Sequence, residues 1–243
     1  MPDPGYAAQA PALTFLSSAR FRARPWLPSW PTGSSAPLGV ALLSLMIVIV
    51  DYGVGNIGSV ASMLNKIGAP ARIGCTPESL LSADKLILPG VGHFDRAMTE
   101  LRSRGLLGPL NQAVLEQRKK VLGICLGAQL LGHQSEEGQL PGLGWLPMLV
   151  RKFDSAQVRV PHMGWSQVSP LRTDLFGNEP EQRFYFVHSY YMECEDGRDV
   201  LATARYGKEF ACAVHRDNIY GVQFHPEKSH RFGLKLLECF AGV

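Results

Sequence analysis

The sequence predicts an α/β fold in which a doubly wound, mainly parallel sheet carries additional antiparallel strands. From Met46 to about residue 125, short apolar runs alternate with stretches of helical periodicity, which is typical of a parallel sheet between helices. Beyond residue 145, strand-like runs follow one another with short turns, which indicates hairpins added to that sheet. No internal repeat and no linker follow residue 45, so residues 46–243 are predicted to form one domain.

The elements of the first half follow from apolar spacing and from residues typical of helix ends. The helix expected at 57–67 has apolar residues at helical spacing and ends before a glycine. Thr76 and Pro77 are typical of an N-cap and a first helical turn, so a short helix is expected to begin there. In chain order, the expected strands cover residues 46–51, 71–74, 85–90 and the run that ends at Cys125, and the other helices cover about 94–104 and 108–118.

The second half is richer in strands, and its short turns are typical of antiparallel pairing. Residues 216–218 read RDN between two apolar runs, which predicts a hairpin. A final helix is expected near residues 231–241. The expected strands of this half cover residues 148–153, 158–165, 183–190, 200–206, 210–215 and 218–224.

Composition and charge exclude several classes of protein. The net charge is only +3 without a basic stripe, so a nucleic-acid-binding surface is not expected. The five cysteines are scattered without a CxxC pair, which argues against zinc and disulfides and favours the reducing cytoplasm. The histidines show no metal-ligand spacing, so the sequence predicts no metal site and no cofactor.

Residues 1–45 differ from the rest of the chain. They hold seven prolines and no sustained periodicity, so they are predicted to be a disordered extension or the product of a mis-set translation start. The apolar run at 37–50 is shorter than the 18 or so residues that a membrane span needs, so no membrane segment is expected. The alternative for the extension is a targeting peptide, since it has several arginines and few acidic residues.

The motif GICLGAQ carries Cys125 at the point where an apolar strand becomes a helix. Together with DYGVGN (51–56) and PGVGHF (89–94), it falls at the carboxyl ends of predicted strands, where doubly wound sheets bind ligands. Gly123 and Gly127 relieve crowding around the sharp turn, as in a nucleophile elbow. The helix N-terminus that follows favours the thiolate form of such a cysteine. Cys125 is therefore a candidate nucleophile, and the alternative is a buried structural cysteine.

The motif GVQFHPEKS supplies the base and the orienting group that a nucleophilic cysteine needs. A strand carries His225 to its end, and Pro226 biases the residue before it toward an extended conformation. On an extended backbone, the side chains of His225 and Glu227 project to the same side, so Glu227 can orient the imidazole. The alternative is an ordinary polar junction between a strand and a loop.

Taken together, GICLGAQ and FHPEKS resemble the class I glutamine amidotransferases, in which a Cys-His-Glu set hydrolyses L-glutamine and releases ammonia. More narrowly, DYGVGN, PGVGHF, PHMGW, FYFVHSYY and GVQFHPEKS are similar to the branch of glutaminase subunits that serve imidazole glycerol phosphate synthesis in the histidine pathway. The resemblance runs from Met46 to Val243 and leaves only the extension uncovered.

The resemblance implies a catalytic role for each residue of the two motifs. Cys125 would attack the glutamine carboxamide and form a thioester, with His225 as acid and base and Glu227 as its orienting group. The developing negative charge on oxygen needs N–H donors. The Leu126 N–H would be one donor, and the peptide around Val91 would reorient to supply the second.

The resemblance also implies residues that bind the substrate and a partner. Gln129 would bond the amino-acid end of glutamine, and the segment of His188, Ser189 and Tyr190 would line its pocket through backbone groups. A (βα)₈-barrel cyclase subunit would form a heterodimer with this chain over the active-site face and receive the ammonia. The residues expected at that interface are Met163, Trp165 and Lys228.

Three alternatives remain open from the sequence. The motifs GNIGS and GLGW, together with PGVGHF, are also similar to a paralogous branch that donates ammonia to a sugar-modifying enzyme of surface polysaccharides. A stand-alone cysteine hydrolase or peptidase would have a related α/β fold, but Gln129 and the spacing of His225 and Glu227 argue against it. A non-catalytic binding subunit is disfavoured because every member of the triad is present.

Overall fold

The computed structural model describes residues 45–178 and 180–243, and the domain predicted from Met46 onward falls in this part. The predicted extension, except for Leu45, lies outside the described residues. The first half contains, in chain order, β1 (Ile47–Val50), α1 (Ile57–Lys66), β2 (Ala71–Gly74), α2 (Pro77–Leu81), β3 (Lys85–Gly90), α3 (Phe94–Ser103), α4 (Leu107–Asn111), β4 (Lys120–Cys125) and α5 (Leu126–Gln129).

The second half contains, in chain order, β5 (Gln134–Ser135), β6 (Met148–Lys152), β7 (His162–Pro170), β8 (Arg183–His188), β9 (Tyr190–Cys194), β10 (Val200–Tyr206), β11 (Lys208–Arg216), β12 (Ile219–Val222) and α6 (His230–Gly242). Short 3₁₀ turns precede β10 and α6. None of the helices in the described part of the chain has both the length and the apolar character needed to cross a bilayer.

The strands of the described chain form a 12-stranded sheet with the order β2-β1-β3-β4-β12-β11-β10-β7-β8, and β5, β6 and β9 attach beside this path. Strands β2, β1, β3, β4 and β12 pair in parallel. Strands β11, β10, β7 and β8 continue the sheet with antiparallel pairs. The predicted fold class, a mainly parallel doubly wound sheet with antiparallel additions, is therefore confirmed.

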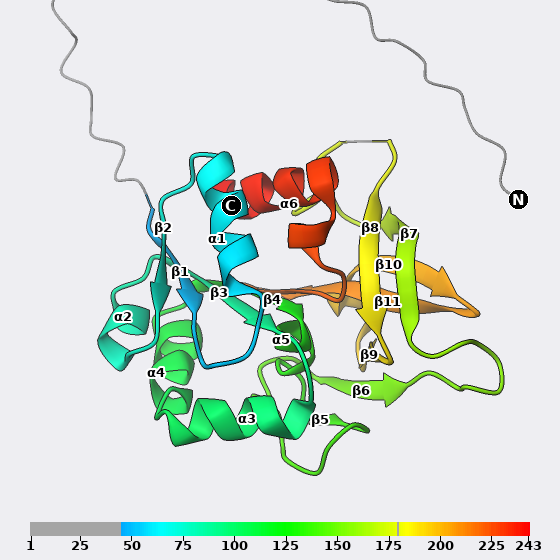
Figure 1. Cartoon of the computed structure of the whole chain (residues 1–243), viewed down its shortest axis with the longest axis horizontal. Coiled ribbons are helices and arrows are strands. Elements are labelled where there is room, and N and C mark those ends of the chain that lie inside the picture. The colour runs from blue at the N-terminus through cyan, green and yellow to red at the C-terminus, as the bar shows by residue number, and fades with distance from the viewer. Residues whose placement is uncertain (1–44, 179) are drawn as a thin grey trace, which may run out of the picture. The chain divides into compact units, whose positions relative to one another are not determined.

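Helices cover both faces of the parallel strands, as Figure 1 shows for α1 and α6 on one side and α3 and α4 on the other. Because successive side chains of a strand point to opposite faces, β1 contributes to two separate cores. Ile47 and Ile49 pack with residues of α1 and α6, whereas Val48 and Val50 pack with residues of α2, α3 and α4. Burial on both faces explains why this strand is apolar at every position.

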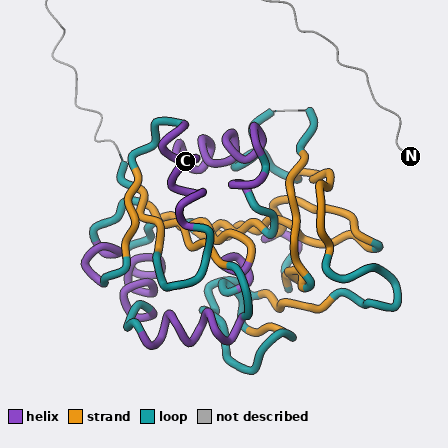
Figure 2. The backbone as a smooth tube through the Cα atoms, viewed as in Figure 1, coloured by secondary structure: helices purple, strands orange, loops and turns teal. Residues whose placement is uncertain are grey.

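The antiparallel part extends the sheet beyond the region covered by helices. In Figure 2, strands and loops predominate around β6 to β10, whereas helices flank the parallel strands. The predicted hairpin joins β11 to β12, where Arg216 pairs with Ile219 and Asp217 adopts a positive φ of 56° in the turn. Because β12 pairs with β11 on one side and with β4 on the other, it connects the two halves of the sheet.

Two strand predictions were wrong in their boundaries. The strand expected at 158–165 begins only at His162, because Pro161 has no N–H to donate and Val158 instead donates its N–H to the Asp154 carbonyl in a turn. The strand expected at 183–190 is interrupted at Ser189, where the chain changes partners. Before it, β8 pairs with β7, and after it, β9 pairs with β6.

Two helix predictions differ in detail from the structure. The helix expected at 108–118 consists of α4 and a π-helical segment, Gln112–Glu116. There the Asn218 side-chain amide donates to the Val114 and Lys119 carbonyls, so a side chain takes the place of a regular helical bond. The helix after Cys125 is a single turn, because the loop at 143–146 bonds to the carbonyls of Leu130 and Leu131.

Candidate active site

Cys125 stands at the sharp turn between β4 and α5. Its φ of 54° and ψ of −112° are unusual for a residue with a side chain, and the surrounding glycines make the turn possible. A Cβ at Gly127 would lie 1.8 Å from the Leu88 carbonyl oxygen, and one at Gly123 would lie 2.7 Å from the Cα of Ala128. The predicted strand, turn and helix are therefore present, and the turn holds the thiol 7% exposed at the end of the strand.

His225 and Glu227 form a buried pair beside this turn. The two groups meet at 2.8 Å between His225 Nδ1 and Glu227 Oε1. The expected geometry was wrong in one respect: Glu227 lies in a 3₁₀ turn at 226–228 and not on extended backbone. Ser229 holds this turn by donating its hydroxyl to the His225 carbonyl. Among the described residues, Glu227 Oε2 has no hydrogen-bond partner, and Oε1 is bonded to the imidazole of His225.

The environment of His225 favours the charged imidazolium. Burial lowers the pKa of His225, but hydrogen bonds and charge attraction from Cys125 and Glu227 outweigh burial and raise the pKa from 6.5 to about 9. At neutral pH the ring therefore carries a proton on both nitrogens. The proton on Nδ1 is directed at Glu227, which leaves the Nε2 proton for chemistry at the other edge of the ring.

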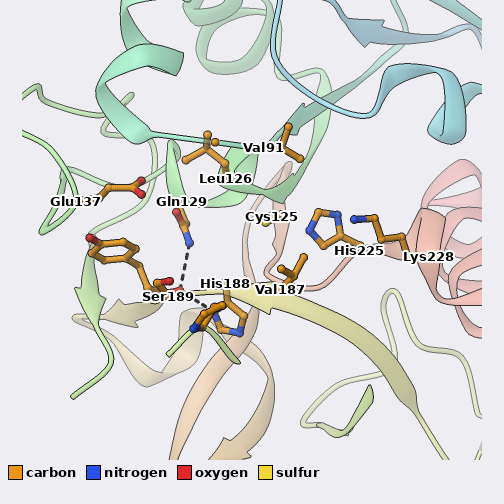
Figure 3. Close-up of a pocket in the computed structure, with 13 residues that line it drawn as sticks. Val91, Cys125, Leu126, Gln129, Glu137, Val187, His188, Ser189, His225 and Lys228 are labelled. Atoms are coloured by element: carbon orange, nitrogen blue, oxygen red, sulfur yellow. Dashed lines mark hydrogen bonds between the residues drawn. The ribbon is translucent and has the colours of Figure 1, made fainter. Parts of the chain in front are cut away.

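A cavity of about 400 Å³ opens beside Cys125 and His225. This volume falls in the usual range for sites that bind a small molecule. Figure 3 shows Cys125 near the middle of the cavity, His225 and Lys228 to one side, and Gln129 and Glu137 to the other. The cavity is lined by Val91, Gly92, Cys125, Leu126, Gln129, Glu137, Pro161, Val187, His188, Ser189, Tyr190, His225 and Lys228.

Gln129 is 4% exposed and is held by two acceptors. Its Nε2 donates to the Tyr190 carbonyl at 3.2 Å and to Gln223 Oε1 at 3.0 Å. Both amide protons are therefore used, and the side-chain oxygen is available to the cavity. The sequence predicted Gln129 and Tyr190 in the site, and the structure brings the two into direct contact.

His188 belongs to a chain of buried hydrogen bonds behind the cavity wall. Its Nδ1 donates to the Tyr190 carbonyl at 2.7 Å, so its Nε2 accepts from His162 Nδ1 at 2.9 Å, and His162 Nε2 accepts from the Ser166 hydroxyl at 2.8 Å. Burial lowers the pKa of His188 to about 3 and that of His162 to about 4, so both rings are neutral at pH 7. The pair thus supports the wall without contributing charge.

The PGVG loop leaves β3 directly beside the nucleophile, because Gly90 pairs with Cys125 in the sheet. The buried Tyr52 hydroxyl donates to the Pro89 carbonyl at 2.7 Å, and this hydrogen bond helps to fix the position of the loop. A Cβ at Gly90 would lie 2.6 Å from the Gly127 nitrogen, which explains a glycine at this position. Val91 at the tip lines the cavity and is half-exposed.

The residues predicted for a partner interface lie outside the cavity, except for Lys228 at its edge. Met163 is 61% exposed and Trp165 is 40% exposed. The Trp165 ring stacks on the ring of His230 at 5.6 Å between centroids with an angle of 5°. Two large apolar side chains thus stand at the surface on β7, the strand that also carries Ser166.

Two polar residues of the site, Glu137 and Gln223, were not predicted from the sequence. Glu137 lines the cavity and accepts from the Phe94 N–H at 2.9 Å. Gln223 contacts Cys125 and is fully buried. A glutamine within an otherwise apolar strand end was a usable signal for Gln223, whereas nothing in the local pattern distinguishes Glu137. Within the described residues, no group of three or more histidine, cysteine or acidic side chains could hold a metal ion.

Comparisons with known proteins point to one family. Residues 48–241 match the family described as "Glutamine amidotransferase class-I". The chain is 52% identical over 198 residues to "Imidazole glycerol phosphate synthase subunit HisH 2" of Pseudomonas aeruginosa, which covers 80% of this chain and 98% of that protein. It is 48% identical over 204 residues to "Imidazole glycerol phosphate synthase subunit HisH" of Bdellovibrio bacteriovorus, with 82% and 100% covered.

Solved structures share the fold at low sequence identity. A "Crystal structure of glutamine amidotransferase" superposes with a TM-score of 0.64 at 23% identity, covering 81% of this chain and 99% of that one. "Structure of PurLQS from Thermotoga maritima" superposes with a TM-score of 0.64 at 18% identity, covering 82% and 99%.

Proposed function

The chain belongs to the class I glutamine amidotransferase family, among the glutaminase subunits of imidazole glycerol phosphate synthase, and on this premise we propose that it supplies ammonia from L-glutamine to histidine biosynthesis through Cys125, His225 and Glu227. The observation that supports these roles best is the strained turn that presents Cys125 in a cavity beside the buried His225 and Glu227 pair. Nucleophilic catalysis by a cysteine requires such a base and such an orienting group.

The reaction begins with attack of the Cys125 sulfur on the carboxamide carbon of glutamine. A C–S bond forms, the C–N bond breaks, and the His225 Nε2 proton goes to the departing nitrogen, which leaves as ammonia. Because the pKa of His225 is about 9, the ring holds this proton at neutral pH. Water then attacks the thioester and gives up a proton to His225, so that glutamate leaves and the thiolate is restored.

Negative charge on the carbonyl oxygen during attack requires N–H donors. The Leu126 N–H is the first of α5, directly after the nucleophile, and serves as one donor. The peptide around Val91 serves as the second, since it lies on the loop that runs beside Cys125 and both flanking residues are glycines. Loss of one such donor typically costs about 10²–10³ in rate.

The other end of the cavity fits the α-amino and α-carboxyl groups of glutamine. The Gln129 side-chain oxygen and the Glu137 carboxylate both accept hydrogen bonds, so they suit an ammonium group. The backbone of His188, Ser189 and Tyr190 forms the opposite wall. A substrate bound between these groups would place its carboxamide at Cys125.

The acceptor of the ammonia is a (βα)₈-barrel cyclase subunit, which we propose docks over the cavity and forms a heterodimer with this chain. Exposed Met163 and Trp165 supply the apolar contacts, and Lys228 at the cavity edge faces the partner. The names of the relatives favour the histidine pathway over the sugar-modifying alternative. All five cysteines are free thiols, which supports the cytoplasm as the compartment.

The test measures glutamate release with and without a cyclase subunit of the histidine pathway and its ligand. We expect slow hydrolysis by the chain alone and a rate that is higher by orders of magnitude with the loaded partner. The Cys125→Ala variant should release no glutamate but should support synthesis from added ammonia. A fast rate without the partner would contradict control by the cyclase, and full turnover by Cys125→Ala would contradict the assigned nucleophile.

A further inference from the structure

Gln223 lies directly behind the nucleophile, at the end of β12. Its side chain is 0% exposed, and its Nε2 stands 3.8 Å from the Cys125 sulfur. Its Oε1 accepts from Gln129 Nε2 at 3.0 Å. A buried amide of this kind needs partners at both ends, and here both partners belong to the glutamine site.

The hydrogen-bond pattern fixes which end of Gln223 faces the sulfur. The Tyr190 carbonyl can only accept, so the group of Gln129 that it contacts must be the NH₂. The second proton of that NH₂ then needs an acceptor, which must be Gln223 Oε1. The NH₂ of Gln223 is therefore the end that points at Cys125. The reversed orientation would bring two NH₂ groups together and turn an oxygen lone pair toward the sulfur.

We propose that Gln223 is a catalytic residue that donates an N–H hydrogen bond to the Cys125 sulfur and stabilises the thiolate, while its oxygen holds Gln129 in the orientation that binds glutamine. A thiolate accepts hydrogen bonds more strongly than a thiol does, so this donor favours the reactive form. The chemical consequence rests on the proposed glutaminase function, but the contact with the sulfur does not.

Two substitutions distinguish the effect of the Gln223 N–H donor from the effect of its oxygen acceptor. Gln223→Met has a similar length, no N–H donor and only a weakly accepting sulfur, so it removes both amide hydrogen bonds with little change in volume. Gln223→Glu keeps an oxygen for Gln129 but replaces the donor with a negative charge next to the sulfur. The matched control is Gln182→Met, since Gln182 is 5% exposed and bonds the Phe176 carbonyl away from the cavity.

The first readout is alkylation of Cys125 by iodoacetamide as a function of pH, followed by mass spectrometry of the peptide that carries it, because the other cysteines also react. In Gln223→Met, we expect the pH of half-maximal rate to rise by about one to two units, since a hydrogen bond to a charged group changes an equilibrium by about 10- to 100-fold. The rise should be larger in Gln223→Glu. The Gln182→Met control should retain the wild-type profile.

The second readout is glutamate release with the cyclase present. Gln223→Met should lower kcat by about 10- to 100-fold and also raise KM, whereas Gln223→Glu should affect mainly kcat, because its oxygen still holds Gln129. If the wild-type chain releases no glutamate while the alkylation profiles shift as expected, the proposed function fails and the contact with the sulfur stands.

A third measurement uses the unsubstituted chain and so does not depend on the folding of any variant. Alkylation of Cys125 should shift the side-chain amide resonances of Gln223 and, through it, those of Gln129. Unchanged Gln223 resonances, or identical alkylation profiles in folded wild-type and Gln223→Met chains, would overturn the proposal.

Discussion

His225 holds its proton more tightly than a histidine in water, and the reason lies in two neighbours. Burial disfavours the charged ring, but Cys125 and Glu227 together more than compensate and raise the pKa to about 9. Because of this raised pKa, the contribution of His225 to the stability of the chain depends on pH. The favourable interactions of the imidazolium are fully present below about pH 6.5 and are lost as the pH rises through about 9.

We predict that the Cys125→Ala and Glu227→Gln variants both lower the pKa of His225, because each removes a group that stabilises the charged ring. NMR titration of the histidine ring resonances measures this shift directly. The difference in unfolding free energy between wild type and Glu227→Gln should be largest below pH 6.5 and should narrow as the pH rises through about 9. An unchanged His225 titration in both variants would contradict the triad arrangement.

The sequence indicated this pair of residues but not its full surroundings. His225 and Glu227 are two residues apart, so local geometry alone brings them together, although through a 3₁₀ turn and not the expected extended backbone. Gln223 reaches Cys125 from a position 98 residues further along the chain. Contacts of that kind depend on strand order, which local pattern does not determine.

The turn between β4 and α5 requires glycines, which have no side chain, at two positions beside Cys125. We predict that Gly127→Ala lowers the unfolding free energy by about 3 kcal/mol or more, because its Cβ would lie 1.8 Å from the Leu88 carbonyl oxygen and the backbone would have to move. The matched control is Gly58→Ala in α1, where the Cβ meets nothing within 4 Å. That change should stabilise the chain by up to about 1 kcal/mol.

Urea unfolding of the two alanine variants measures both effects. Equal urea midpoints for Gly127→Ala and Gly58→Ala would contradict the prediction, because they would show that the turn accommodates a Cβ at residue 127 without loss of stability. Gly127→Ala should also lose glutamate release, since Cys125 can no longer hold its strained backbone conformation.

The elements that the sequence predicted best are those with a strong local pattern. Thr76 caps α2 as expected, with its side chain accepting from the Ser79 N–H. The break at Ser189 and the π-helical segment at 112–116 arise from tertiary contacts. At Ser189 the chain changes its partner strand, and at 112–116 the Asn218 side chain enters from the turn between β11 and β12. Neither contact leaves a signal in the local sequence.

The exposed apolar side chains on β7 form the surface on which we propose that the cyclase docks. We predict that Trp165→Ala weakens association with the cyclase by about tenfold or more and reduces the ratio of activated to basal glutamate release, because large aromatic residues dominate such interfaces. Leu171 is 60% exposed just after the opposite end of β7, so Leu171→Ala is the matched control. Calorimetric titration with the cyclase compares the two variants.

Equal affinity in Trp165→Ala and Leu171→Ala would show that the partner binds elsewhere. Trp165 is already stacked on His230 in the free chain, so little side-chain freedom remains to be lost when a partner packs on it. The sequence predicted the fold class, but only the structure shows that Trp165 lies beside His230.

Hydrolysis of glutamine by this chain should proceed through a covalent thioester on Cys125. The most direct test is to mix the chain with L-glutamine and the loaded cyclase, quench with acid during turnover, and identify the modified peptide by mass spectrometry. We expect a γ-glutamyl adduct on the peptide that contains Cys125, and no adduct in the Cys125→Ala variant. Steady glutamate release with no adduct on that peptide, or with an adduct on another cysteine, would contradict the role of Cys125 as the nucleophile.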